Sequence, residues 1–246
     1  MKKSKLSLLV TIISILLLSC SKDEDSSLTD KETLVLPKKM NYIENTEYDK
    51  VGRDTYFTYN GNKLESTMTG GQWKSVYTYT GDLITKIEHY EFTNLYYTTE
   101  YTYKNNKLET RRITRKSTQE TYTTYYIHNS DGSVSYSNTN SEGKYIFKDG
   151  NLINNGKEKF EYDTKNNPFK NITGIDVITL DDDNELNFNV SKNNIIKSTS
   201  VDSNNSSYSF NILKFNNDGF PIEDLGYWND GITSSKSGSC YKYYYE

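Results

Sequence analysis

Few residues in this chain are of the types that carry out enzyme chemistry. The only histidines are His89 in "KIEHYEF" and His128 in "YYIHNS", and neither adjoins a nucleophile motif such as G-x-S-x-G. Acid–base or nucleophilic catalysis needs a base held near a nucleophile, or paired carboxylates in a cleft. Because both histidines lie in strand-like surroundings, we expect each to be structural or solvent-facing, and we expect the protein not to be an enzyme.

The acidic run Asp181-Asp182-Asp183-Asn184-Glu185 is the best candidate for a metal site. Ca²⁺ prefers clustered carboxylate and carbonyl oxygens from a loop. The run lacks the ligand order and the glycine of an EF-hand, so a solvated turn after "DVITL" is the alternative reading. A zinc site needs three or four His, Cys or carboxylate ligands at a recognisable spacing, which the two histidines and Cys240 do not supply. We therefore expect no cofactor and leave calcium open at this run.

Aromatic residues suggest a second kind of chemistry. The chain has 23 tyrosines, and its two tryptophans, Trp73 in "GGQWKS" and Trp228 in "GYWNDG", lie in glycine-rich segments. Sugar rings stack on exposed flat aromatics, and neighbouring hydroxyl and amide groups bond their rims. Trp73 and Trp228 are thus candidate glycan-binding residues. The alternative for most tyrosines is structural, since rings at i and i+2 form cross-strand ladders that stabilise a sheet.

One phrase recurs along the chain: alternating tyrosines, an Asn/Gly turn, then an apolar residue. It reads "YFTYNGNKLE" from Tyr56, "YTYTGDLI" from Tyr77 and "YTYKNNKLE" from Tyr101. Side chains at i and i+2 share one face of a strand, and Asn and Gly tolerate the positive φ of tight hairpin turns. Each copy therefore predicts a β-hairpin. Looser copies are "TYYIHNSDGSV", "KYIFKDGNLI", "FEYDTKNNPF", "NFNVSKNNII" and "ILKFNNDGFP", and the apolar residues after the eight turns are Leu64, Leu83, Leu108, Val134, Leu152, Phe169, Ile195 and Phe220.

Consecutive hairpins pair as an antiparallel meander. Eight hairpins give about fifteen strands, more than one open sheet usually holds without curling or splitting. We expect one all-β domain over residues 37–246, built as a large curved or rolled sheet, with a β-sandwich as the alternative. The chain contains no alanine, the best helix former, and no convincing amphipathic helix follows residue 36.

The balance of charge disfavours nucleic acid as a partner. The formal charge is −4, and removal of a leader containing Lys2, Lys3 and Lys5 makes it −7. Nucleic-acid affinity rests mainly on clustered Lys and Arg. The one basic cluster, Arg111 to Lys116 in "RRITRK", is short and is interpreted as a solvated strand or turn.

Cys240 is the only thiol after Cys20, so no disulfide is expected within the chain, and Cys240 is expected to be a small buried residue.

The first 19 residues have the form of a signal peptide: lysines, an apolar run of thirteen residues from Leu6 to Leu18, and a small residue. The run is too short to span a bilayer, which takes about 20 residues. Leu17-Leu18-Ser19-Cys20 resembles the lipobox of bacterial lipoproteins, which implies acylation of Cys20 and attachment to a membrane by lipid. An ordinary signal peptide ending near a cysteine is the alternative.

Residues 20–36 are expected to be an acidic tether. The segment Lys22-Asp23-Glu24-Asp25 resembles the export tag of surface-exposed lipoproteins in Bacteroidetes, which implies an outer-membrane lipoprotein at the cell surface. A periplasm-facing lipoprotein is the alternative, since a charge run is usually only a solvated tether.

The tyrosine phrases, Tyr162 to Phe169 above all, resemble the YD repeats of the RHS family over about residues 55–225. RHS proteins wrap a shell around cargo, but this chain has few, irregular copies and no second domain to enclose. The nearer likeness is to YD-repeat-like lipoproteins of Bacteroidetes. We expect a lipid-anchored, non-enzymatic envelope protein with a structural or interaction role. Its expected partners are the membrane, through the N-terminal lipid, and either a glycan or another envelope protein. Surface glycan binding is the alternative.

Overall fold

The computed structural model describes residues 34–45, 50–181, 190–201, 207–229 and 234–245. The leader, Cys20 and the Lys22–Asp25 segment lie outside the described residues. The described residues from Leu34 onward form one compact unit. It contains sixteen antiparallel strands and one helical turn, α1. Their bounds are β1 Pro37–Asn45, β2 Lys50–Asn60, β3 Lys63–Thr69, β4 Trp73–Thr80, β5 Leu83–Glu91, β6 Asn94–Lys104, β7 Lys107–Arg115, β8 Thr121–His128, β9 Val134–Ser137, β10 Glu142–Lys148, β11 Asn151–Asn154, β12 Glu158–Tyr162, α1 Asp176–Thr179, β13 Ile195–Ser200, β14 Ser207–Phe215, β15 Pro221–Asn229 and β16 Ser234–Tyr245.

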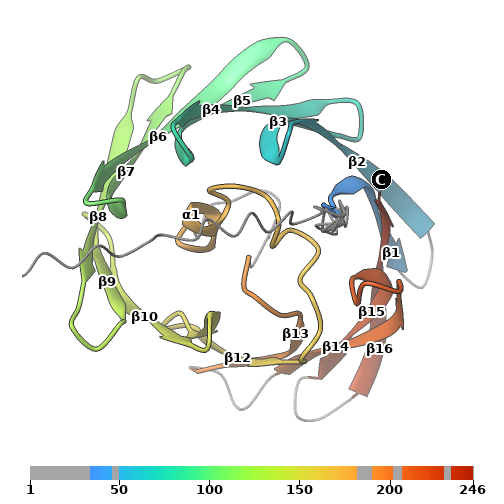
Figure 1. Cartoon of the computed structure of the whole chain (residues 1–246). Helices are drawn as coiled ribbons and strands as arrows, with labels where there is room; N and C mark the ends of the chain where they lie inside the picture. The colour runs from blue at the N-terminus through green and yellow to red at the C-terminus, as the bar shows by residue number, and fades with distance from the viewer. Residues whose placement is uncertain (1–33, 46–49, 182–189, 202–206, 230–233, 246) are drawn as a thin grey trace, which may run out of the picture. The chain divides into compact units, whose positions relative to one another are not determined.

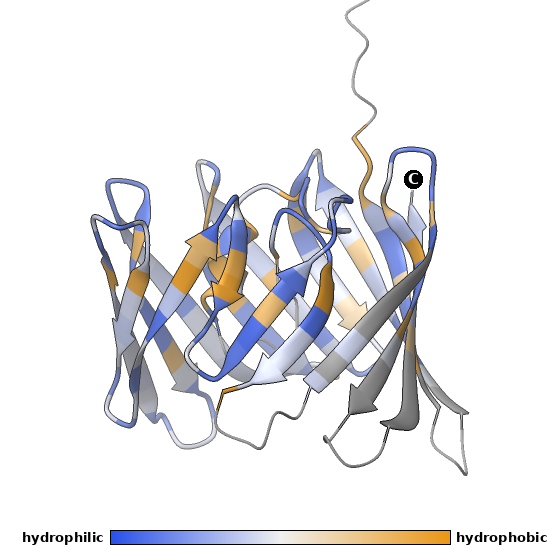
Figure 2. Ribbon diagram, turned by 90° about the horizontal axis from the view of Figure 1, so that it is seen from below, coloured by the Kyte–Doolittle hydropathy of each residue, from blue (hydrophilic) through white to orange (hydrophobic). Residues whose placement is uncertain are grey.

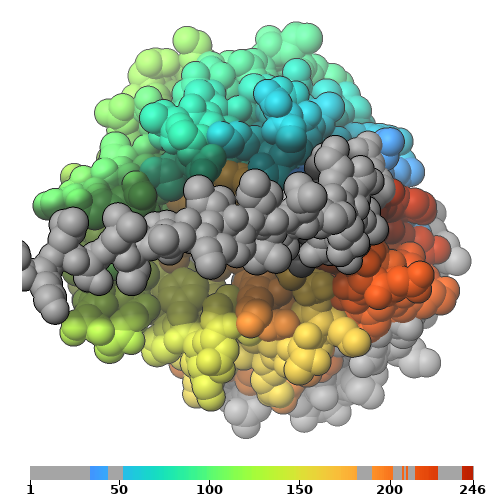
Figure 3. Space-filling model, in the orientation of Figure 1, coloured from blue at the N-terminus to red at the C-terminus, as the bar shows by residue number. Residues whose placement is uncertain are grey.

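The strands form one sheet that closes on itself as a barrel. Each strand pairs with the next in the chain, and β1 pairs with β16, for example Tyr42 with Tyr241. Figure 1 shows the closed ring viewed along its axis, and Figure 3 shows the same face in space-filling form, with the colours following the ring in chain order. The predicted meander in one curved sheet is confirmed, and the β-sandwich alternative is wrong because a single sheet curls until its edges meet.

Side chains alternate between the two faces of the wall. On β6, Thr99 and Tyr101 point inward and are buried, while Thr102 is exposed on the outer face. Figure 2 shows hydrophilic and hydrophobic residues alternating along the strands. The turns follow the expected chemistry: Asn105 and Asn106 join β6 to β7 with φ of 53° and 59°, as a type I′ turn requires. Among the described residues, no helix is long and apolar enough to cross a bilayer.

The repeated phrase has a physical explanation in the structure. The apolar residue after most turns points inward and is buried: Leu64, Leu108, Val134, Leu152, Phe169 and Phe220 are all 5% exposed or less. In the second copy Ile84 takes this place and not Leu83, since Ile84 pairs with Tyr79 as Leu64 pairs with Tyr59 and Leu108 with Tyr103. The ring near each turn bonds the neighbouring hairpin: the hydroxyl of Tyr103 donates to the Ile84 carbonyl at 2.6 Å. Tyr162 and Tyr245 donate likewise to the carbonyls of Leu152 and Pro221.

Two of the eight predicted hairpins are wrong. "FEYDTKNNPF" does not fold back, because β12 ends at Tyr162, and the chain then turns into the interior of the ring, where Figure 1 shows it with α1. Pro168 lacks the N–H that a paired strand needs. In "NFNVSKNNII", Ile195 begins β13, which pairs with β12 on one side and β14 on the other and so leaves no edge for the expected first strand; residues 187–189 lie outside the described part. We call the described interior residues, 163–181 and 190–194, the plug.

The plug supplies the core that the ring needs. Its buried residues Ile172, Ile175, Val177, Ile178 and Leu180 belong to one apolar cluster with the inward side chains of the wall. Polar contacts fix it there: Tyr79 Oη donates to the Thr173 carbonyl at 3.2 Å, and Tyr126 Oη donates to the Leu180 carbonyl at 2.9 Å. Barrels of this strand number leave a wide interior unless something fills it, so the plug makes a packed core possible.

Candidate binding pocket inside the barrel

The two ends of the barrel differ. The plug packs against the end that carries the β2–β3 and β4–β5 turns, where Thr173 N–H donates to the Asn62 carbonyl at 2.9 Å. Because the turns of a meander alternate between the two ends, the β7–β8 and β9–β10 turns lie at the opposite end. The candidate site lies on the inner wall toward this opposite end.

The pocket has a volume of about 470 Å³ and is lined by β6, β7, β8 and the β9–β10 turn. This is within the range of roughly 300–1,000 Å³ typical of small-molecule sites. Strand register places its residues in rows: Tyr97 on β6 is opposite Arg115 on β7, and Ile113 on β7 is opposite Tyr122 on β8. Three adjacent strands therefore present two aromatic rings and a guanidinium on one inward face.

Two tyrosines keep an accessible surface at the pocket. Tyr96 is 47% exposed and Tyr122 is 45% exposed. The Arg115 guanidinium lies 5.9 Å from the centre of the Tyr122 ring, a cation–π distance. The Tyr122 hydroxyl donates to the Glu120 carboxylate at 3.2 Å, which fixes the ring at the edge of the pocket.

The floor of the pocket is an ion pair between wall and plug. Arg111 on β7 bonds the Asp181 carboxylate, and the Tyr101 hydroxyl donates to the other oxygen of the same carboxylate at 2.8 Å. All three side chains are buried. Burial and the Asp181 charge raise the pKa of Tyr101 well above its usual value, so its hydroxyl stays a donor. The floor is thereby fixed and electrically balanced.

Tyr97, on one side of the pocket, packs against the buried His89. The His89 ring stacks on Tyr97, with centroids 4.0 Å apart, and its Nδ1 lies 3.0 Å from Ser75 Oγ. Burial lowers the pKa of His89 to about 4, so the ring is neutral at pH 7. His128 bonds the Leu108 carbonyl at 2.9 Å, in the place that a tyrosine takes in other hairpins. Both histidines thus hold the wall together.

The β9–β10 turn closes the other side. The Asn138 Oδ1 atom accepts the backbone N–H groups of Asn140 and Ser141 at 2.8 and 2.9 Å, which shapes this turn. The turn contributes residues with amide and hydroxyl groups to the lining, and Thr124, which points inward on β8, adds another hydroxyl. The pocket therefore combines aromatic faces with many neutral hydrogen-bonding groups.

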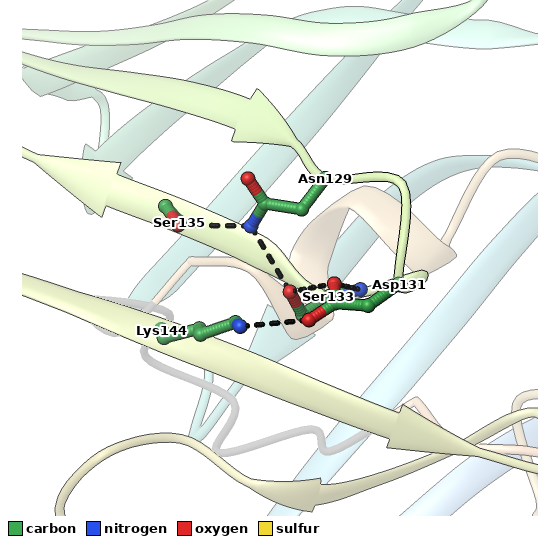
Figure 4. A network of polar contacts seen from close by, with 5 residues as sticks. All are labelled: Asn129, Asp131, Ser133, Ser135 and Lys144. Atoms are coloured by element: carbon green, nitrogen blue, oxygen red, sulfur yellow. Dashed lines mark hydrogen bonds and ion pairs between the residues drawn. The ribbon is translucent and has the colours of Figure 1, made fainter.

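A second polar cluster lies at the β8–β9 turn (Figure 4). Asp131 accepts from the Ser133 N–H at 3.0 Å and from Lys144 Nζ at 2.9 Å, and Asn129 Nδ2 donates to the hydroxyls of Ser133 and Ser135. The Ser133 and Lys144 bonds hold the pKa of Asp131 well below its usual value. Because these side chains bond one another, the cluster stabilises a turn.

The predicted site residues do not converge. Trp73 on β4 has its ring 6.1 Å from that of Tyr96, so it lies beside the pocket. Trp228 pairs with Tyr208 in the β14–β15 ladder, and four strands of the ring lie between β4 and β15. The side chain of Trp228, like Cys20 and the Lys22–Asp25 segment, lies outside the described residues. The two tryptophans are therefore on separate parts of the ring, and glycan binding by either of them stays a prediction.

The acidic run is placed only at its first residue. Asp181 binds Arg111 and Tyr101, so this carboxylate is already engaged, and Asp182 to Glu185 lie outside the described residues. Within the described part of the chain, no group of three or more His, Cys, Asp or Glu is arranged to hold a metal ion. Cys240 is half-buried rather than fully buried.

Sequence reasoning missed the lining residues. The prediction that the basic cluster "RRITRK" is a solvated strand or turn is right for Arg112, which is exposed and pairs with Glu100 at 2.6 Å, and for Lys116, which is exposed in the β7–β8 turn. Arg111 is buried, and Arg115 lines the pocket. Strand alternation places residues 111, 113 and 115 on one face. This alternation could have identified Arg111, Ile113 and Arg115 as a group from the sequence, but it does not say which face of the strand points inward.

No family model matches the chain, and no curated protein matches its sequence. Among solved structures, it is similar to a porin-like protein from Bacteroides uniformis. The TM-score is 0.42 with 10% sequence identity, over 85% of this chain and 96% of the other.

Proposed function

We propose that the protein is a lipid-anchored, non-enzymatic protein of the cell envelope that binds a glycan inside the mouth of its barrel. The observation that supports glycan binding is the inner-wall pocket with two partly exposed tyrosines among hydroxyl and amide groups. Sugars present alternating apolar faces and polar rims, so they need flat rings and many hydrogen-bonding groups together. The pocket offers both.

The outer face of the wall supports a location in water beside a membrane. Across β6, β7 and β8 it carries threonines and ion pairs, such as Thr102 with Thr110 at 2.7 Å and Arg112 with Glu100 at 2.6 Å. A barrel that crosses a bilayer carries an apolar band outside and polar residues within. On these three strands the outer face carries these polar groups, with Tyr125 and Ile127 of β8 as exposed apolar side chains. We infer that acylated Cys20 anchors the protein and that the Lys22–Asp25 segment directs it to the cell surface.

Glycan binding is tested with an array probed by the full chain in detergent micelles. Tyr122→Ala should abolish binding, because it removes a stacking face from the pocket. Tyr125→Ala is the matched control: it lies on the same strand, is 57% exposed, and does not line the pocket. Silence of the unsubstituted protein across plant, host and microbial glycans would refute the proposal, as would equal loss with both substitutions.

Surface location is tested by adding protease to whole cells. We expect the protein to be cleaved, and we expect cleavage to stop when Lys22, Asp23, Glu24 and Asp25 are all replaced by neutral residues. Protection of the unchanged protein in intact cells, with cleavage only after the outer membrane is opened, would place it in the periplasm.

A further inference from the structure

The two charged residues that line the pocket have different surroundings. Of the residues that line it, only Arg111 and Arg115 are charged. Arg111 is balanced by Asp181 in the buried floor. Among the described residues, no carboxylate lies within ion-pair distance of Arg115. Among the residues that the structure describes, Arg115 is therefore a positive charge at the pocket without an ion-pair partner.

Arg115 is held in place by its neighbours. It is opposite Tyr97 in the β6–β7 ladder, and its guanidinium lies 5.9 Å from the Tyr122 ring centre. A guanidinium that rests on a ring keeps its edge donors available to a ligand. Its backbone N–H donates to the Glu120 carbonyl at 3.0 Å, which fixes the end of β7. The cation thus lies beside the rings proposed to stack on sugar.

Glu120, the acidic residue that follows Arg115 in the sequence, is engaged by hydroxyl groups. The Glu120 carboxylate accepts the hydroxyls of Thr118 and Tyr122, at 3.0 and 3.2 Å, and lies at the exposed β7–β8 turn. The chain as a whole is acidic, with a formal charge of −4. A cationic pocket in an acidic protein favours an anion there and disfavours anions elsewhere on the surface.

We propose that the pocket selects a carboxylate-bearing glycan, such as a uronic-acid oligosaccharide, and that Arg115 is the residue that selects it. This inference rests on the glycan-binding function proposed above. A planar carboxylate matches the paired donors of a guanidinium, and one negative charge matches one uncompensated cation. A phosphomonoester carries about 1.5 to 2 negative charges, which a single arginine would leave partly unbalanced.

The test compares a uronic-acid oligosaccharide with its methyl ester, using titration calorimetry on the full chain in detergent micelles. The ester keeps the sugar rings and removes the charge. The acid should bind about tenfold tighter than the ester, as one added charge-assisted hydrogen bond implies. Arg115→Gln should reduce the affinity for the acid to that for the ester and leave the ester unchanged. Raising the salt concentration should weaken binding of the acid only.

Arg112→Gln is the matched control, because it removes the same charge from the outer face of the same strand. It should leave both affinities unchanged. Equal affinity for acid and ester, or equal loss of both in Arg115→Gln, would overturn the assignment while glycan binding stands. Tighter binding of a sulfated oligosaccharide of the same length would overturn the choice of carboxylate. If neither of these sugars binds while the array shows a neutral glycan bound and lost in Tyr122→Ala, the assignment of a carboxylate fails and glycan binding stands. Silence across the whole array is the result that overturns glycan binding itself.

Discussion

Arg111 and Arg112 are neighbours in the sequence with opposite surroundings. Arg111 is 6% exposed and bonds the buried Asp181, whereas Arg112 is exposed and bonds Glu100 on the outer face. Removal of one partner from a buried pair leaves the other charge without compensation, which is far more costly than the loss of an exposed pair. The two arginines therefore form a natural comparison.

We predict that Arg111→Met lowers the free energy of unfolding by about 3–5 kcal/mol, whereas Arg112→Met lowers it by at most about 1 kcal/mol. Urea denaturation followed by tyrosine fluorescence measures both. Arg111→Met combined with Asp181→Leu should recover much of the loss, because no buried charge then remains. Equal, small effects of the two single substitutions would mean that the Arg111–Asp181 pair does not join plug and wall in solution.

Asp224 on β15 is a second buried carboxyl group, and it lowers the stability of the protein as the pH rises. It is 7% exposed and accepts the Tyr241 N–H at 3.1 Å and the Tyr243 hydroxyl at 3.3 Å. Burial raises the pKa of Asp224 to about 7, against these two bonds, and Glu223 adds to the rise. The folded state therefore holds this proton at pH values where the unfolded chain has lost it. This contribution to stability is complete below about pH 4 and is lost as the pH rises to 7.

We predict that Asp224→Asn removes this pH dependence, since the amide oxygen can still accept the Tyr241 N–H and carries no charge. The difference in unfolding free energy between variant and unsubstituted protein should grow by up to about 4 kcal/mol from pH 4 to pH 7. Urea titrations at several pH values measure it, and other carboxyls cancel in the difference. A difference that stays constant across this range would contradict the raised pKa.

At the scale of elements, the hairpin was the most predictable feature. Alternating tyrosines, Asn or Gly turns and a following leucine are local signals, and residues such as Leu64 and Leu108 take the buried inward positions expected of a repeat. The plug was not predictable from these signals. "FEYDTKNNPF" has the composition of a hairpin, and only the need to fill a wide ring explains why Phe169 packs in the interior instead. That need comes from closure of the whole sheet.

Gly174 shows how closely the plug approaches the wall. Its φ is +71°, and an added Cβ would lie 2.5 Å from the Asp82 carbonyl oxygen. Gly81, in the turn beside Asp82, also has positive φ, +57°, but an added Cβ there would meet nothing within 4 Å. The two glycines share a backbone conformation and differ in the space around them.

We predict that Gly81→Ala lowers the unfolding free energy by about 1 kcal/mol, from backbone strain alone. Gly174→Ala should cost at least about 1 kcal/mol more, because plug or wall must also shift. Thermal or urea unfolding of the two variants in parallel gives the comparison. Equal costs would show that the plug does not contact the β4–β5 turn as closely as the structure has it.

At the scale of the whole molecule, two features could not be predicted from the sequence: the closure of the sheet into a barrel, and which face of each strand points inward. About fifteen strands were expected, and the need to curl followed from that number. The pairing of β1 with β16 joins segments about 200 residues apart, and no local sequence pattern predicts it. Nor could the pattern say which face of each strand points inward. In the closed ring, the outer faces of β6, β7 and β8 carry threonines and the Arg112–Glu100 pair, and the plug fills the interior. The membrane attachment proposed above therefore depends on a residue outside the barrel.

Cys20 is the residue proposed to supply that attachment. Each buried methylene contributes about 0.8 kcal/mol and one acyl chain anchors only marginally, so the several chains of a lipidated cysteine are needed. We predict that Cys20→Ser moves the protein from the membrane fraction to the soluble fraction of fractionated cells. Cys240→Ser, which changes the other cysteine on β16 of the barrel, should leave the distribution unchanged. If Cys20→Ser stays with the membrane after washing at high salt and alkaline pH, either the barrel or an uncleaved leader holds the protein there, and the lipid anchor is refuted.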